Sequence, residues 1–344
     1  MMKTKSIILG VLAVIVITFI YYWPTVHYGI DMGMGQLKII SNSKPIATIL
    51  NDSTFPDSLK KKLKLIQAVR QYAVDSLGLK DTDNYTSVYD QKGKEVMWVV
   101  QACQPYKFEI KQWKFPFVGT VPYKGFFNWD DAREEKEKLE KENWDTGIFN
   151  PSGWSTLGWF NDPILSSMLS HSDGDLASLI IHEMVHSTIY VKDNAELNEN
   201  LASFIGDKGA ESFLLQAFGD SAQSYKSYIK IEEIRRKKVQ HMLRATKKLD
   251  SLYHTFLKSY PVSQKRKMKN DFIRKIFETL DTINPYFSKI NPMLVDKELP
   301  NNTYFINYLT YESMYQTLNF EWTNTYGESL KALILGYKSK YMIG

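Results

Sequence analysis

The chain has 344 residues, 44% of them hydrophobic, so it can bury a substantial core as one large domain or two modest ones. Charged residues make up 24% and aromatic residues 14%, which excludes a disordered or low-complexity protein. The single cysteine, Cys103, excludes an intrachain disulfide and a cysteine-based zinc site. We expect its thiol to be buried and inert, and any bound metal to depend on His, Asp and Glu.

The N-terminal segment is predicted to be a membrane anchor. Residues 7–23 form an apolar run interrupted only by Gly10 and Thr18, and Lys3 and Lys5 precede it. Seventeen residues at about 1.5 Å rise each just reach the length that spans a bilayer. A cleaved signal peptide is the alternative, but the run is long for one and no Ala-x-Ala-like site follows it. We therefore predict an uncleaved anchor at 1–23 and place residues 24–344 on the periplasmic or extracytoplasmic side.

The remaining elements predict an α+β, mainly α-helical metallopeptidase domain over 24–344. Apolar residues at helical spacing predict an amphipathic helix over 59–77, which ends at Gly78. Two segments rich in β-branched and aromatic residues, 95–103 and 107–121, predict a small sheet, and 130–143 predicts a solvated, charge-dense helix. Residues 24–165 are thus a mixed part and 166–344 a helical part. The helical part is expected to contain helices at 175–190, 194–215 and 225 to about 258, with two or three more between 264 and 341.

Positive charge is concentrated in one segment of the helical part. Residues 226–275 hold sixteen Lys and Arg against four Asp and Glu. Such a helix could touch anionic lipid or nucleic acid, whereas the simpler interpretation is a solvated helix face. Aromatic residues are not interleaved with these charges as in RNA-binding segments, so no nucleic-acid partner is expected.

One motif carries chemistry. Residues 182–186 read His-Glu-Met-Val-His, and apolar residues precede them, which predicts a buried helix. Side chains four apart share a helical face, so His182 and His186 can bind one metal ion, while Glu183 is offset and can contact water beside the ion. The alternative is a core helix whose two histidines only make hydrogen bonds.

Glu199 is the predicted third ligand. A catalytic zinc takes three protein ligands and leaves a fourth position open. The first helix is expected to end near Tyr190, and Asp193 with Glu196 to form a capping box that begins the next helix. In the resulting antiparallel hairpin His186 and Glu199 lie nearly level. Glu196 is the competing ligand, but its capping position disfavours it.

The residues around Glu199 support a close helix pair. Ala202, Ser203 and Gly206 follow it by three, four and seven positions, and all are small, which allows two helices to approach at about 8 Å. The sequence thus predicts one Zn²⁺ per chain, with Glu183 as the general base that takes a proton from water and passes it to the leaving amine of a peptide substrate.

Further segments carry a family resemblance. They are Tyr28 with Gly35, Gln36 and Leu37, then 112–116, 122–127, 155–163, 179–191, 197–199 with Ala202, Asn301 with Asn302, and Thr310 with Tyr311. With these motifs the sequence resembles the predicted zinc aminopeptidases found in many bacteria, a former domain of unknown function with a gluzincin-like metal site. The resemblance implies zinc at His182, His186 and Glu199, Glu183 as the base, and peptide hydrolysis.

The sequence departs from related proteins at several places. Relatives often carry a lipid-bearing cysteine where this chain has Trp23 and Pro24, and a cysteine pair near the positions of Lys114 and Thr120. Other gluzincins place an Asp four residues after the third ligand, where Ser203 stands here as a weaker partner for a histidine N–H. The Gly-x-Met-Glu-Asn segment with which better-known aminopeptidases hold a free amine is absent from the sequence.

Two more candidates lie outside the motif. Residues 153–158 do not match a serine nucleophile elbow, because the final glycine is displaced by one position. This segment either lines the cleft as an edge strand or contributes Trp154, Trp159 and Phe160 to the core. Tyr311 is the candidate for oxyanion stabilisation, and the alternative for it is packing in the core.

Two functional hypotheses follow from these residues. The first is a membrane-anchored zinc peptidase, expected to be an aminopeptidase. The second is a membrane-tethered binding or scaffold protein with a structural zinc, which would require a fourth protein ligand to close the coordination shell.

Overall fold

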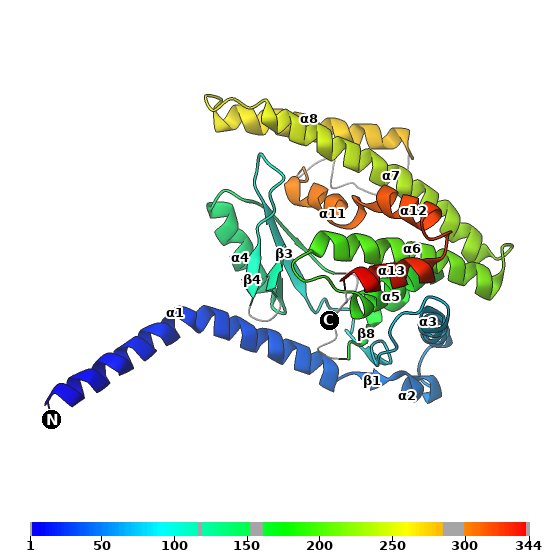
Figure 1. Cartoon of the computed structure of the whole chain (residues 1–344), viewed down its shortest axis with the longest axis horizontal. Coiled ribbons are helices and arrows are strands. Elements are labelled where there is room, and N and C mark those ends of the chain that lie inside the picture. Colours follow the sequence, from blue (N-terminus) through cyan, green and yellow to red (C-terminus); the bar gives the residue numbers. More distant parts are fainter. Residues whose placement is uncertain (1, 116–118, 152–160, 285–298, 342–344) are drawn as a thin grey trace.

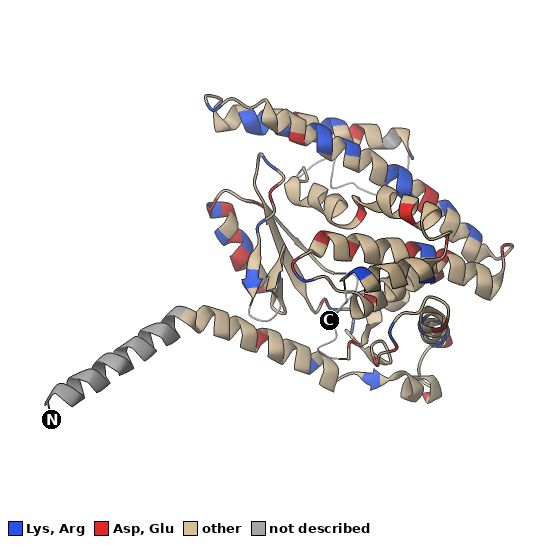
Figure 2. Ribbon diagram, in the orientation of Figure 1, with Lys and Arg blue, Asp and Glu red and all other residues tan. Residues whose placement is uncertain are grey.

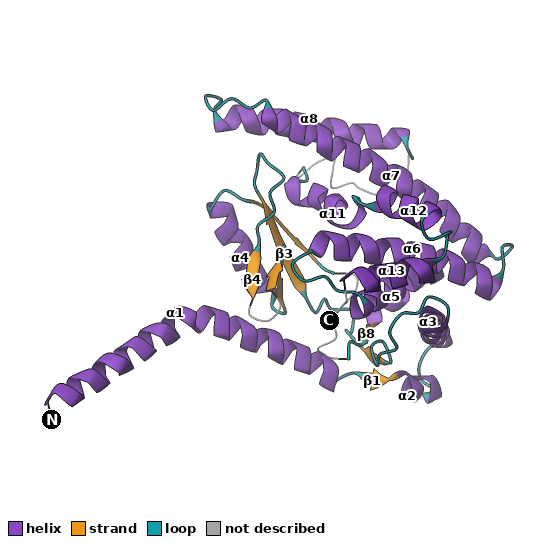
Figure 3. Ribbon diagram, in the orientation of Figure 1, coloured by secondary structure: helices purple, strands orange, loops and turns teal. Residues whose placement is uncertain are grey.

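The architecture comes from a computed structural model that describes residues 2–115, 119–151, 161–284 and 299–341, with side chains from residue 22 onward except that of Asp281. Figure 3 shows a mainly helical α+β molecule in which short strands lie to one side of a group of packed helices. The mainly α-helical α+β class with a small sheet, predicted from the sequence, is therefore confirmed. Within the described residues every strand precedes Ser166.

The first helix is longer than the predicted anchor. Helix α1 spans Met2–Ser41 and continues through Pro24. From Tyr28 onward its residues contact the body of the protein: the Tyr28 hydroxyl donates to Gly125 O at 2.9 Å, and Ile39 is buried. No helix among the residues with described side chains combines the length and apolar character needed to cross a membrane. That finding gives no support to the anchor predicted at 7–23, most of which falls on residues 2–21, whose side chains lie outside the description.

The mixed part begins with short elements that pack on the main core. Strand β1 (Lys44–Pro45) pairs antiparallel with β2 (Ser87–Tyr89), which pairs parallel with β8 (Ile164–Leu165). Helix α2 (Ile46–Asn51) follows β1, and α3 (Asp57–Asp75) matches the amphipathic helix predicted over 59–77. Gly78 follows α3 at φ +73°, a conformation that favours glycine.

A second sheet faces the helices. Strand β3 (Trp98–Cys103) is central and antiparallel to both neighbours, β6 (Lys124–Phe126) and β7 (Asp145–Phe149). Its alternate residues Val100 and Ala102 pack against the charged helix α4 (Trp129–Lys141), as strand geometry requires. Cys103 is buried and free, and burial raises the pKa of its thiol to about 12, as expected of an inert cysteine.

The segment 107–121, predicted with 95–103 to supply a small sheet, contains two short strands that pair with each other. Strands β4 (Trp113–Phe115) and β5 (Gly119–Val121) form a separate two-stranded ribbon in which Lys114 lies directly opposite Thr120. These two residues occupy the places where relatives tend to carry a cysteine pair.

The helical part supplies most of the core. It comprises the 3₁₀ helix η1 (Ser166–Ser170), α5 (Asp173–Thr188), α6 (Ala195–Phe218), α7 (Gln223–His254), α8 (Val262–Glu278), the 3₁₀ helix η2 (Thr279–Thr282), α11 (Asn302–Glu312), α12 (Tyr315–Asn324) and α13 (Leu330–Tyr341). In the described residues after Gln264 there are more helices than the two or three predicted. Helices α5 and α6 form the antiparallel pair at the centre of the largest apolar cluster.

The basic segment does not present all of its charges on one surface. Figure 2 shows Lys and Arg spread along α7 and α8 with acidic residues between them. Arg236 bonds Asp207 and Glu312, Arg235 bonds Asp175, and Lys269 is buried against Asp145. Several of these cations therefore hold helices together, which differs from the solvated face expected of the whole segment.

Candidate metal centre

Helix α5 forms where the sequence supplies both a cap and a buried face. The Ser172 hydroxyl accepts from the Asp175 backbone N–H, and two aspartates occupy the first turn, where negative charge is favoured. The helix begins two residues before the predicted start and ends at Thr188. Its spacing places His182 and His186 side by side with their rings 4.8 Å apart.

The turn that follows differs from the prediction in its cap. Asn194, and not Asp193, caps α6, because its side chain accepts from the Leu197 N–H. Asp193 instead adopts φ +58° and accepts from the Thr120 N–H at 3.0 Å. The Asn198 amide bonds both backbone groups of Val191, each at 2.8 Å, and so fixes the hairpin.

Small residues bring α6 against α5, as the sequence predicts. A Cβ atom on Gly206 would lie 2.8 Å from the Ser178 carbonyl oxygen and 3.2 Å from His182 Cβ. Only glycine fits this contact without displacing a helix. One turn before the zinc motif, the Ser178 hydroxyl also donates to the Asp207 carboxylate at 2.9 Å. The helix pair is thus held together directly beside the histidines.

The predicted ligands converge. His182 Nε2 lies 3.1 Å from His186 Nε2, and Glu199 Oε2 lies 3.4 Å from each of them. Ligand atoms held about 2.1 Å from a tetrahedral zinc ion lie about 3.4 Å apart, so the three atoms fit one ion. They form a group able to hold a metal, and no fourth His, Cys, Asp or Glu of the described chain joins it. The rival ligand Glu196 is exposed and accepts from the Ser313 hydroxyl.

The three candidate ligands form a buried cluster in which the histidines and the carboxylate shift one another's pKa. Burial alone would lower the pKa of His186, but the Glu199 carboxylate outweighs it and raises that pKa to about 9. Burial would likewise raise the pKa of Glu199, and the two histidines instead hold it far below its usual range. A divalent ion would replace the proton on His186 and keep the carboxylate ionised.

Glu183 lies beside the three ligands and is buried. Burial raises its pKa, with the two histidines acting in the opposite direction and Glu199 in the same direction. A carboxylate with a raised pKa accepts a proton more readily. Glu183 lines the same cavity as the ligands, as the offset position in the motif predicts.

One expected partner is not observed. His186 Nδ1 is buried and has no hydrogen-bond partner. Ser203, predicted as a weaker partner for a histidine N–H, does not bond this nitrogen, although it lines the cavity. The hydrogen bond that usually orients a ligand histidine is missing at this ring.

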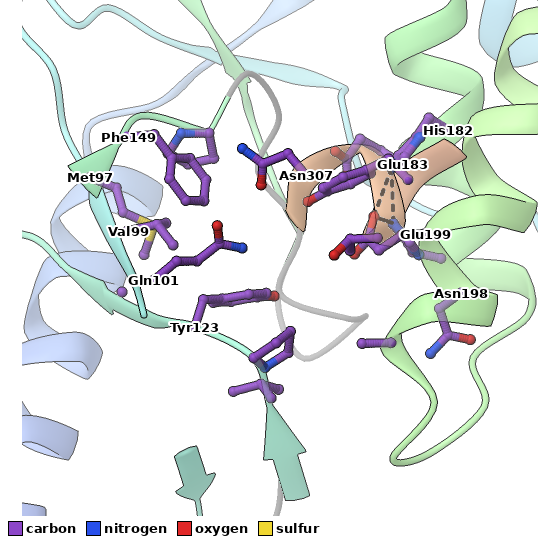
Figure 4. Close-up of a pocket in the computed structure, with 18 of the residues that line it drawn as sticks. Met97, Val99, Gln101, Tyr123, Phe149, His182, Glu183, Asn198, Glu199 and Asn307 are labelled. Carbon is purple, nitrogen blue, oxygen red and sulfur yellow. Dashed lines mark hydrogen bonds and ion pairs between the residues drawn. The ribbon is translucent and has the colours of Figure 1, made fainter. Parts of the chain in front are cut away.

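A cavity of about 1230 Å³ opens on the metal centre. Figure 4 shows it between Met97, Val99 and Gln101, at the start of and along β3, and the helical residues Glu183 and Glu199. The turn between β5 and β6 and the second half of α1 complete its wall. A peptide could therefore lie between the sheet and the histidines.

Two tyrosines reach the metal centre from different parts of the chain. Tyr311 on α11, the candidate for oxyanion stabilisation, lines the cavity, and Tyr123, between β5 and β6, lines it as well. Burial and then the Glu199 carboxylate raise the pKa of both phenols, and Glu183 adds to the effect. Both hydroxyls thus remain protonated and able to donate. Tyr123 was not predicted, although it belongs to the segment 122–127 that carries the family resemblance.

Buried asparagines hold α11 over the cavity. Asn301 caps the helix and donates to Thr146 O, while the Asn302 amide donates to Gln104 O and accepts from the Tyr253 hydroxyl. At the other end, the Asn200 amide donates to Thr310 O at 2.7 Å. The asparagine pair 301 and 302 therefore positions the helix that carries Tyr311.

Part of the predicted cleft lies outside the described residues. The segment 153–158 with Trp154, and also Trp159 and Phe160, falls within 152–160. Both interpretations of this segment remain predictions.

The domain is mainly helical α+β, and its His-Glu-x-x-His helix, the glutamate on the adjoining helix and the cavity lie together. This combination is typical of the metallohydrolase class, for which the protein is a candidate. The chain belongs to the family described as "Putative aminopeptidase", whose model matches residues 27–333. This match covers all of the candidate metal ligands and most of the chain. Neither the search of curated proteins nor that of solved structures gave a match.

Proposed function

We propose that the protein is a zinc-dependent peptidase with aminopeptidase activity. The observation that carries the proposal is the near-equilateral triangle of ligand atoms, with sides of 3.1, 3.4 and 3.4 Å, at the wall of a peptide-sized cavity. His182, His186 and Glu199 would hold one Zn²⁺. When bound, zinc supplies a Lewis acid that polarises a carbonyl group and acidifies water.

The chain's own residues would carry the proton transfers. Glu183 accepts a proton from the attacking water and then donates it to the nitrogen of the leaving amine, so the carboxylate is regenerated in each turnover. The hydroxyls of Tyr311 and Tyr123 would donate hydrogen bonds to the oxygen on which negative charge develops. Each substrate peptide bond thus adds one water and gives one carboxylate and one amine.

The alternative is a scaffold protein with a structural zinc. A structural zinc is closed by four protein ligands, whereas the cluster of the described chain supplies three and faces a cavity. Glu183 is buried beside the three ligands but is not one of them, so a purely structural zinc would not require it. These features favour turnover over a purely structural metal.

The membrane location is likewise a proposal. From the end of the apolar run 7–23 onward, α1 exposes large apolar side chains: Tyr22, Trp23, Val26, Ile30, Met34 and Leu37. Such a face is typical of a helix that touches lipid. It supports an anchor with the metal centre outside the cytoplasm, as the lysines before the run predict.

The decisive experiment compares the full-length protein with Glu183→Gln in a peptide-library digest, together with metal analysis of both. Wild type should bind one zinc and cleave peptides, and Glu183→Gln should keep the zinc and lose about 10²–10⁴-fold in kcat. Tyr311→Phe and Tyr123→Phe test the oxyanion role, because each should lower kcat and leave KM nearly unchanged. Undiminished cleavage by Glu183→Gln, or a protein that takes up no metal, would refute the proposal.

A further inference from the structure

The wall of the cavity that faces the metal centre contains a polar group with no partner. The side chains of Val99 and Gln101 on β3, and of Met97 just before the strand, line the cavity. Gln101 is 2% exposed, yet its Oε1 atom makes no hydrogen bond. A buried carbonyl oxygen without a donor is destabilising, and a ligand that donates a hydrogen bond to it would remove that cost.

A second unpartnered amide comes from α11. The Oδ1 atom of Asn307 is buried and also lacks a hydrogen-bond partner. Helix α11 packs against the β3–β7 pair where Gln101 lies opposite Gly147. A Cβ atom added to Gly147 would lie 2.7 Å from Thr303 Oγ1 on α11. Asn307 is one helical turn beyond Thr303 on the same face. Figure 4 shows Gln101 and Asn307 entering the space beside Phe149 and Tyr123 from opposite sides.

The surroundings determine which ligand group fits. The neighbouring side chains Met97, Val99 and Phe149 are apolar, and Tyr123 is protonated, so none of them carries a charge. A carboxylate would face two carbonyl oxygens, and an ammonium would exchange its hydration shell for only two neutral acceptors. A carboxamide is neutral and its nitrogen donates to carbonyl oxygens. On the α1 wall of the same cavity, Gln36 Nε2 is a buried donor without a partner, which also indicates a polar, uncharged ligand.

We propose that Gln101 and Asn307 form a substrate subsite that binds the N–H groups of a carboxamide. The proposal rests on the proposed peptidase function, because the ligand is taken to be part of a peptide. The two N–H groups of an Asn or Gln side chain match the two unpaired oxygens, and a backbone amide supplies the same chemistry with one N–H. Residues that touch the substrate here determine specificity without taking part in proton transfer.

The test uses the full-length zinc-loaded protein and matched peptides that carry Gln, Glu, Lys or Leu at one varied position. Wild type should favour the Gln peptide over each of the other three by about tenfold or more in kcat/KM at one position near the cleaved bond, because a site built for hydrogen bonding rejects analogues that leave it unpaired. Gln101→Met and Asn307→Leu should abolish this preference. Met97→Leu, which changes the same wall without an amide, is the matched control and should keep it.

Binding measurements separate this proposal from the peptidase proposal. The dissociation constants of the same peptides are measured with Glu183→Gln, so that recognition is read without turnover. A Gln preference that disappears in Gln101→Met supports the subsite even if wild type cleaves nothing. If the two amide variants alter neither the side-chain preference of cleavage nor the effect of backbone N-methylation on binding, the peptidase proposal stands and the subsite is overturned.

Two further peptide pairs identify the source of the bound group. If N-methylation of one backbone amide weakens binding by about tenfold in the Glu183→Gln protein and has no effect once Gln101→Met is added, the bound carboxamide is in the backbone. A free and an N-acetylated peptide form the second pair. If the amide variants change only the ratio of the dissociation constants of the free and the N-acetylated peptide, the site binds an ammonium group and the proposal is wrong.

Discussion

At the residue scale, Glu199 links proton binding to metal binding. Its carboxylate lies 3.4 Å from both histidine Nε2 atoms and keeps His186 protonated well above its usual pKa of 6.5. A metal ligand must be deprotonated, so metal uptake at neutral pH has to release the proton on His186. The same ion pair stabilises the metal-free fold fully below pH 6.5, and its contribution is lost as pH rises through about 9.

Zinc affinity should therefore increase with pH over this window. From pH 7 to about 9 the affinity is expected to rise about tenfold per unit, and to level off above the pKa of His186. Competition against a chromophoric chelator at a series of pH values measures it. In Glu199→Gln the affinity should be lower and the rise should end at a lower pH, because the charge that raises the His186 pKa is gone. A flat profile in wild type would contradict the assignment of these ligands.

At the element scale, the centre depends on how closely α6 approaches α5. Gly206 lies against Ser178 and His182, and the Asn198 amide fixes the connecting turn. The ligand glutamate and the ligand histidines are on different helices, so any increase in helix separation acts directly on the distances between ligand atoms. Packed helices transmit such a displacement because their interface has no free volume.

Gly206→Ala should consequently weaken the metal centre. The added methyl group would lie 2.8 Å from the Ser178 carbonyl oxygen, which forces the helices apart. We expect the free energy of unfolding to fall by about 1–3 kcal/mol despite the better helix propensity of alanine, and zinc affinity to fall with it. Thermal unfolding and chelator competition measure the two effects. Gly33→Ala is the matched helical control, since a Cβ there meets nothing within 4 Å, and equal behaviour of the two variants would disprove the packing argument.

At the scale of the whole molecule, α1 joins the predicted anchor to the wall of the cavity. Tyr28 bonds Gly125, Ile39 enters the main core, and Gln36 lines the cavity, whereas the predicted anchor lies before these residues in the same helix. Figure 1 shows the second half of α1 passing below the strands. The helix is therefore part of the catalytic domain as well as its predicted link to the membrane.

Two truncations separate these roles. A chain of residues 22–344 should leave the membrane fraction and keep the melting temperature and kcat/KM of the full chain. A chain of residues 42–344 should lose about 2–5 kcal/mol of stability, because it lacks Ile39 and the Tyr28 hydrogen bond, and its kcat/KM should also fall. Fractionation, thermal unfolding and peptide cleavage test these expectations. If 42–344 matched 22–344 in stability and activity, α1 would have no part in the cavity.

The sequence alone determined the metal triad because the relevant geometry is local. Four residues separate the two histidines on one helix, and a short turn leads to Glu199, so helical spacing and a hairpin are sufficient to bring them together. The small residues around Glu199 predicted the close helix pair for the same reason. The family resemblance pointed to Tyr311 and to the segment that contains Tyr123, but not to the role of Tyr123.

Only the tertiary structure decided what surrounds the triad. Tyr123, Gln101 and Asn307 are far apart in the sequence, and their approach depends on how α11 lies over the β3–β7 pair and how the β5–β6 turn folds back. A polar residue in a strand gives no sign of whether its oxygen will find a partner, because that depends on atoms from distant segments. The start of α6 was settled in the same way, because Asp193 accepts from the Thr120 N–H of a distant segment and Asn194 takes the capping position.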